Sequence, residues 1–202
     1  MRMIEFASQL AALKNWFSSP SPRQRILRQE LHDLTAVVEV AYNKKSNTFT
    51  AAYSVKTDRF DQIVHGKKVR GGGILTVQCG FVAPPLHQVV GYPERPETLA
   101  RLMETTASES GVFFSALSDL EHVYDELGAR VPQFPFADPR APSHRKLFRA
   151  VIAALLGKAW QQELQCAFDQ LLPGVSRDWF NDVRKRLGQF ELERNKNGRS
   201  IT

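Results

Sequence analysis

The sequence predicts an α+β protein, in which a small antiparallel sheet packed by helices is followed by a mainly helical C-terminal subdomain. Three observations support this fold class. Apolar residues alternate with a period of two over residues 36–55 and 74–82, whereas helical periodicity dominates after residue 97. The strand–helix–strand alternation of a parallel sheet is missing. With 202 residues, 43% hydrophobic and 24% charged, the composition is that of a globular chain.

The first 34 residues are predicted to form two helices. Residues 1–20 carry an apolar stripe at helical spacing, and Glu5 and Lys14 interrupt any run long enough for a signal peptide. We expect an amphipathic surface helix there. Ser21 followed by Pro22 is a helix-start signal, so a second, short helix is expected over residues 23–34.

Three strands are predicted next. One face of a β-hairpin is formed by Ala36, Val38, Val40 and Tyr42 together with Phe49, Ala51, Tyr53 and Val55, and the polar residues 44–47 form its turn. A further strand is predicted over residues 74–82. Its alternation places Cys79 on the buried face, where we expect it to pack as a small hydrophobic side chain.

Helices and a linker complete the front part. Helical segments are expected over residues 96–110 and 112–128, with Gly128 as the C-cap of the second. Four prolines then fall within residues 132–142, which favours an extended linker. The predicted organisation is therefore an α+β domain over 1–131, a Pro-rich linker over 132–142 and a helical subdomain over 143–202.

The distribution of charge and the two cysteines limit the partners, sites and location that the sequence allows. The net charge is +6, and all of it lies in residues 140–202, which contain twelve basic and six acidic side chains. Such an excess permits a nucleic-acid partner. The two cysteines, Cys79 and Cys166, lie far apart in the sequence and have no Cys or His neighbour at metal-ligand spacing. We therefore expect neither a disulfide framework nor a metal site. A reducing, cytoplasmic location is expected for the protein. No run of about 18 apolar residues suggests a membrane span.

The loop HGKKVRGGG over residues 65–73 is a candidate phosphate-binding segment. Three glycines allow backbone N–H groups to approach a phosphate, and Lys67, Lys68 and Arg70 add positive charge. The alternative is a flexible connection into the next strand, because the loop does not match a P-loop. No acid–base constellation accompanies it, so the sequence predicts no enzyme and no cofactor. A nuclease using this loop is the least favoured reading.

The last predicted helix, over residues 176–187 and ending at Gly188, has two contrasting faces. Trp179, Phe180, Val183 and Leu187 gather on one side. Side chains of the types that bind base edges and phosphates gather on the other, namely Arg177, Asn181, Arg184 and, at their edge, Lys185. An ordinary amphipathic helix with a basic polar face is the competing interpretation.

A β-hairpin is predicted after this helix. Phe190 and Leu192 alternate with Glu191 and Glu193, and Asn197-Gly198 is a strong hairpin-turn signal. The tip of the hairpin would carry Arg194, Lys196 and Arg199.

Helix, turn, basic helix and hairpin together resemble the winged helix-turn-helix superfamily of DNA-binding domains. The resemblance lies in GVSRDWFNDVRKRL, as turn and recognition helix, and in FELERNKNGR, as wing. It implies that Arg177, Asn181, Arg184 and Lys185 face the groove of duplex DNA, and that Lys196 and Arg199 touch the flanking backbone. Arg194, at the tip of the hairpin, is also expected to bind DNA.

The leading hypothesis is therefore a non-enzymatic protein that binds double-stranded DNA through its C-terminal helix and hairpin, as a regulatory or accessory factor. The alternative is a protein-interaction module, such as an inhibitor, immunity or adaptor protein. Its interface would be the acidic segment 94–126 or the amphipathic first helix.

Overall fold

The chain divides into two compact units. The computed structural model describes residues 25–43, 48–69, 73–79, 90–91, 108–130, 133–134, 141–171 and 176–198. One unit comprises Met1–Val55 and Gly71–Ser118, and the other Lys56–Arg70 and Asp119–Thr202. This division differs from the boundary expected at residues 132–142. The expected helix over 1–20, the turn 44–47 and most of the Pro-rich segment lie outside the described residues.

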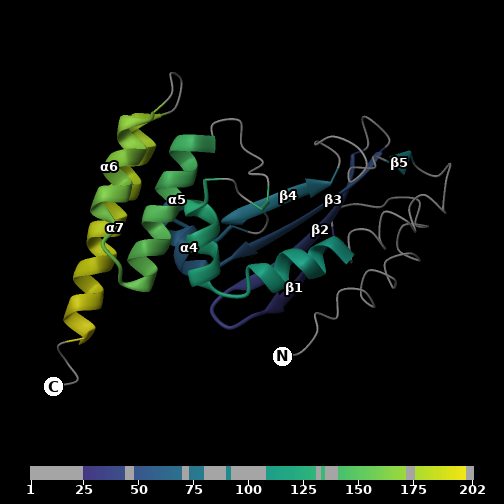
Figure 1. Cartoon of the computed structure of the whole chain (residues 1–202), viewed down its shortest axis with the longest axis horizontal. Helices are drawn as coiled ribbons and strands as arrows, with labels where there is room; N and C mark the ends of the chain where they lie inside the picture. Colours follow the sequence, from purple (N-terminus) through teal and green to yellow (C-terminus); the bar gives the residue numbers. More distant parts are fainter. Residues whose placement is uncertain are drawn as a thin grey trace. The chain divides into compact units, whose positions relative to one another are not determined.

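The first unit is built on an antiparallel sheet, drawn in Figure 1, in which neighbouring strands follow the order β1-β2-β3-β4. The predicted hairpin is confirmed as β2 (Thr35–Asn43) and β3 (Thr48–Lys56), and the third predicted strand as β4 (Leu75–Cys79). A two-residue strand, β5 (Val90–Gly91), pairs with the start of β3. The α+β class is thereby established.

The helix predicted over residues 23–34 is wrong, because strand β1 (Arg25–Glu30) occupies this segment. β1 pairs with β2 in antiparallel register, with Arg25 opposite Val40 and Glu30 opposite Thr35. A tight turn joins the strands through a hydrogen bond from the Leu31 N–H to the Leu34 carbonyl, 2.8 Å long. Pairing with a neighbouring strand outweighs the weak local preference of this polar segment for helix.

The core of the first unit lies between the sheet and a helix over residues 108–116. Ala36, Val38 and Val40 are fully buried, as the alternating pattern predicts. The ring of Tyr53 packs edge-on against Phe113, with ring centres 5.1 Å apart, and its hydroxyl donates to Glu109 Oε2 at 3.4 Å. Aromatic contacts of this kind fix the helix on one face of the sheet.

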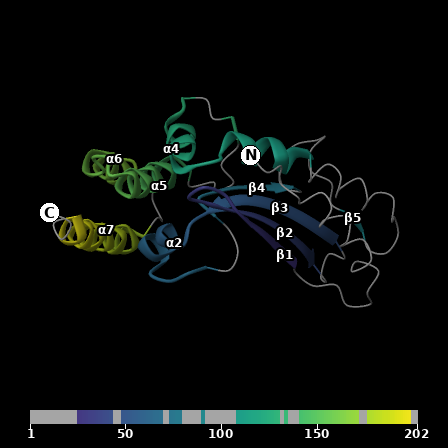
Figure 2. The same cartoon turned by 90° about the horizontal axis from the view of Figure 1, so that it is seen from below.

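The second unit is helical. Its elements are α2 (Asp58–His65), α4 (Leu120–Gly128), α5 (Ala141–Leu156), α6 (Gln161–Asp169) and α7 (Arg177–Gly198). Helix α5 is central, since it packs against each of the other four, and Leu147, Ala150 and Val151 of this helix are fully buried. Figure 2 shows α5 and α6 side by side, with α2 next to the start of α7. None of the helices among the described residues combines the length and apolar character needed to cross a membrane.

One helix of this unit was not predicted, and one expectation needs correction. Helix α2 forms because the Thr57 side chain caps its first turn and Gly66, at φ 71°, ends it in the left-handed region. The single helix expected over 112–128 is interrupted, since the Asp119 side chain accepts the His122 N–H at 2.9 Å and starts α4 anew. Gly128 is the last residue of α4, and Ala129 is its C-cap.

The predicted C-terminal hairpin is wrong, because α7 continues through Gly188 to Gly198. After the buried residue Leu187, the half-buried side chains of Phe190 and Glu191 continue the same face at helical spacing. The alternation that suggested strands spans only a few residues. Asn197-Gly198 lies at the end of a helix, where such residues are also common. Residues 190–198 therefore do not form the strands of a wing.

Candidate nucleic-acid interface

Helix α7 is anchored along one face. Phe180, Val183 and Leu187 are fully buried, and the Phe180 ring lies 5.5 Å from that of Phe168 on α6. The indole N–H of Trp179 donates to the Val64 carbonyl of α2 at 3.1 Å. The buried face predicted from the sequence is thus confirmed, and it leaves the opposite face of the helix exposed.

A continuous row of side chains without an acidic member runs along the exposed face. At about 100° per residue, its members fall within an arc of about 80° on α7. We call this set the α7 row: Arg177, Asn181, Arg184, Gly188, Leu192 and Asn195. Within the described part of the chain, the side chains of Arg177, Asn181 and Arg184 make no hydrogen bond or ion pair. Their side chains are free to contact a partner.

The structure adds three members to the row that sequence reasoning missed. Gly188 was expected to end the helix, and Leu192 and Asn195 were assigned to the hairpin. Leu192 is 63% exposed, and among the described residues only Val112, at 60%, is a comparably exposed large hydrophobic side chain. The signal in the sequence was the helical spacing of the buried residues, which continues beyond residue 188.

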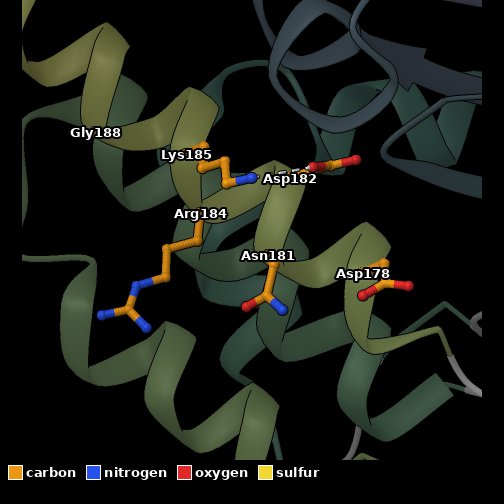
Figure 3. A pocket seen from close by; sticks show the side chains of 6 residues that line it. All are labelled: Asp178, Asn181, Asp182, Arg184, Lys185 and Gly188. Carbon is orange, nitrogen blue, oxygen red and sulfur yellow. Dashed lines mark ion pairs between the residues drawn. The ribbon is translucent and has the colours of Figure 1, made fainter.

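Acidic side chains flank the α7 row on both sides, because the half-buried Glu191 lies about 20° beyond Arg184 on the helical wheel. Asp178, Asp182 and Glu193 are exposed on the neighbouring part of the helix. Lys185 lies between the two sets, and its ammonium is 3.9 Å from Asp182 Oδ1. Figure 3 shows Lys185 reaching toward Asp182, while Arg184 points away from both. The exposed acidic side chains therefore gather on the side of the row that Lys185 borders.

An open depression lies on this face of α7. It is lined by Asp178, Asn181, Asp182, Arg184, Lys185 and Gly188 (Figure 3). Six predicted site residues are on this one helix, and three of them, Asn181, Arg184 and Lys185, line one depression. Arg177 starts the same helix one turn earlier.

The three basic residues assigned to the hairpin have different positions. Arg194 donates to the Ala154 carbonyl at 3.2 Å, at the C-terminal end of α5. A Cβ added at Gly157 would lie 2.5 Å from its guanidinium, so the group fills the space above this glycine. Lys196 is exposed near the end of α7. Arg199 lies outside the described residues.

Three arginines of this unit cap the C-terminal ends of neighbouring helices. Arg145 donates to the carbonyls of Glu126, Leu127 and Ala129 at the end of α4. Arg186 does the same at the end of α2, and Arg194 at the end of α5. Each places a positive charge at the negative end of a helix dipole. Part of the basic excess after residue 140 therefore stabilises the fold.

The start of the loop over residues 65–73 is held by a buried ion pair. Lys56 Nζ lies 2.7 Å from Asp61 Oδ2, and both side chains are almost fully buried. Together they bind the backbone of Val69, because Lys56 donates to its carbonyl and its N–H donates to Asp61 at 3.1 Å. Residues 66–68 are exposed, whereas the backbone of Val69 is held by this ion pair.

The basic side chains of this loop are only partly available. Lys67 is exposed, whereas Lys68 pairs with Asp58 at 2.5 Å, an ion pair exposed to solvent. Arg70 lies outside the described residues. Gly73 has a structural reason to be glycine, since an added Cβ would lie 2.5 Å from the Val55 carbonyl oxygen. The need for glycine at this position therefore does not depend on a phosphate.

The surroundings of His65 are predominantly positive. Loss of solvation lowers the pKa of its imidazole below 6.5, and the charges of Arg186, Lys56 and Lys67 act in the same direction against Asp61. The His65 imidazole therefore releases its proton at a lower pH than a free histidine does.

Two acidic side chains of α4 are engaged within the second unit, and the third, Asp125, is exposed. Glu121 pairs with Lys158, and Glu126 accepts the Phe134 N–H at 2.9 Å. Over the parts of the chain that the structure describes, no group of three His, Cys, Asp or Glu side chains is placed to hold a metal ion. Comparison of the chain with protein-family models, curated proteins and solved structures finds no match.

Proposed function

We propose that the protein binds duplex DNA by laying the exposed face of α7 in the major groove. The observation that carries this proposal is the α7 row: Arg177, Asn181 and Arg184 lie on one exposed stripe, free of partners among the described residues and free of acidic neighbours in the row. Arginine binds guanine O6 and N7, and asparagine binds adenine N6 and N7.

The dimensions of the helix support this proposal. Its 22 residues extend about 33 Å, and an α-helix is about 10–12 Å across, close to the width of about 12 Å of the major groove of B-DNA. The burial of Phe180, Val183 and Leu187 against the other helices fixes α7 as a rigid rod. A rigid, pre-formed binding element loses little conformational entropy on binding.

The asymmetry of charge supports one orientation of the duplex. Phosphates are attracted to Arg177, Arg184 and Lys185 and repelled by Asp178 and Asp182 on the adjoining side. Phosphate contacts supply most of the affinity of such complexes, and base contacts supply the specificity.

The protein-interaction alternative has less support. In the described part of its acidic segment 94–126, Glu121 and Glu126 already have partners within the second unit, and Asp125 is exposed. The first helix, which was the other surface considered, lies outside the described residues.

The test is binding of a fluorescently labelled duplex, measured by anisotropy at several salt concentrations. We expect the double variant Arg177→Ala, Arg184→Ala to bind more weakly and its log Kd to depend less on log salt, with the slope reduced by about two. The matched control removes two exposed arginines elsewhere, Arg59→Ala with Arg130→Ala. If both double variants behave alike, α7 is not the interface. If the parent binds no duplex, the proposal fails.

A duplex RNA of the same length separates groove binding from simple attraction to polyanions. The major groove of A-form RNA is too narrow for side chains to read. We expect much weaker binding to the RNA at equal salt, and equal affinity would contradict insertion of a helix into the groove.

A further inference from the structure

Gly188 is an unexplained residue at the middle of α7. A glycine inside a helix costs about 1 kcal/mol relative to alanine, so it usually has a packing reason. Such reasons exist at Gly73 and Gly128, where an added Cβ would lie within 3 Å of other atoms. At Gly188 an added Cβ would meet nothing within 4 Å. Packing within the described residues therefore does not require this glycine.

The position of Gly188 relates it to the proposed interface. It lines the depression together with Asn181, Arg184 and Lys185. It lies one turn after Arg184 and one turn before Leu192 in the α7 row. Because glycine has no side chain, the surface of the helix is depressed at the centre of the α7 row. The polar residues Asn181 and Arg184 precede this point along the helix, and the exposed apolar residue Leu192 follows it.

We infer that Gly188 is the point at which α7 approaches the floor of the major groove most closely, and that binding is therefore selective for DNA sequence. This inference rests on the proposed function. Without a Cβ at this point, the helix axis can move nearer to the base pairs, so that the shorter side chain of Asn181 as well as Arg184 reaches base edges. Leu192, 63% exposed on the following turn, is placed to contact a thymine methyl group.

Two glycine-to-alanine substitutions separate an effect on DNA affinity from an effect on the stability of the fold. Gly188→Ala adds one methyl group at the row, and Gly111→Ala adds one in the helix over residues 108–116, where an added Cβ also meets nothing within 4 Å. Both substitutions improve helix propensity, so we expect both to raise Tm by about 2–4 °C. Only Gly188→Ala is expected to weaken DNA binding.

The experiment first selects preferred sequences from a pool of randomised 20-base-pair duplexes, using the full chain. We expect enrichment of particular sequences. For the selected duplex, we expect Gly188→Ala to raise Kd at least tenfold, with an unchanged dependence on salt because no charge is lost. Gly111→Ala should leave Kd unchanged.

The outcomes distinguish this inference from the proposed function. If the parent binds duplexes with the expected salt dependence, but no sequence is enriched and Gly188→Ala binds as tightly as the parent, the inference is overturned while the proposed function stands. If Gly188→Ala and Gly111→Ala weaken binding equally, the effect does not come from the row and the inference fails. If the parent binds no duplex, both are overturned.

Discussion

The guanidinium of Arg186 binds the end of helix α2, donating from Nε to the Ile63 carbonyl at 2.6 Å and from Nη2 to the Val64 carbonyl at 3.1 Å. Arg184, two residues earlier on the same helix, is exposed and has no such partner among the described residues. Two arginines of one short segment thus have opposite roles. One fixes α7 to α2, and the other faces the proposed DNA surface.

We expect Arg186→Ala to lower the free energy of unfolding by about 1.5–3 kcal/mol, because it removes charged hydrogen bonds to partly buried carbonyls. Arg186→Lys should lie in between, since an ammonium does not reproduce the planar fork of donors. Arg184→Ala should change stability by about 0.5 kcal/mol or less. Urea denaturation measures all three variants, and equal losses for Arg184→Ala and Arg186→Ala would contradict these roles.

The buried pair of Lys56 and Asp61 should respond differently to single and double substitution. Lys56→Met leaves the buried Asp61 carboxylate without its cation, which we expect to cost about 3–5 kcal/mol. Lys56→Met combined with Asp61→Asn removes both charges and keeps an acceptor for the Val69 N–H. The double variant should therefore be more stable than Lys56→Met alone.

The exposed pair of Lys68 and Asp58 is the control for this experiment. Their side chains are 65% and 56% exposed, so Lys68→Met should cost less than about 1 kcal/mol. Comparable losses for Lys56→Met and Lys68→Met, measured by chemical denaturation, would show that burial of the first pair has little energetic effect.

His65 should make the stability depend on pH. Because its pKa is lowered in the folded protein, the unfolded chain binds more protons than the folded one between the folded pKa and 6.5. The free energy of unfolding therefore falls as pH decreases from 6.5 through the folded pKa, and this residue has no further effect above that window. In His65→Gln the fall should be smaller between pH 7.5 and 5.5. An unchanged profile in thermal unfolding would contradict the assignment.

Asp182 should oppose DNA binding. Its carboxylate is 57% exposed and lies beside Lys185, so Asp182→Asn removes repulsion of phosphates and releases Lys185. We expect a several-fold gain in affinity at low salt that disappears at high salt, and a change in stability of about 0.5 kcal/mol or less. Asp125→Asn on α4 makes the same change of charge away from α7. An equal gain in both variants would indicate a general charge effect.

Much of the fold could be predicted from local patterns. The alternation that places Ala36, Val38 and Val40 on one face is a direct property of a strand, and the spacing of Phe180, Val183 and Leu187 is a direct property of a helix. The same helical spacing also placed Arg177, Asn181 and Arg184, the first members of the α7 row, on the exposed face. The errors arose where local signals were weak or had two meanings, as for β1 and for the Asn197-Gly198 pair.

The sequence by itself determined the α+β class, the strands β2 to β4, the helical character of the C-terminal part, the first half of α7 and the exposure of Arg177, Asn181 and Arg184, because periodicity reports which side of an element is buried. Tertiary structure alone decided which charges hold the fold and which remain available. Arg186 and Arg194 cap α2 and α5 because those helix ends lie beside α7, and Lys56 meets Asp61 around the backbone of Val69. A charged residue looks the same in a sequence in either role, since the role depends on which carbonyl or carboxylate the folded chain brings within about 3 Å.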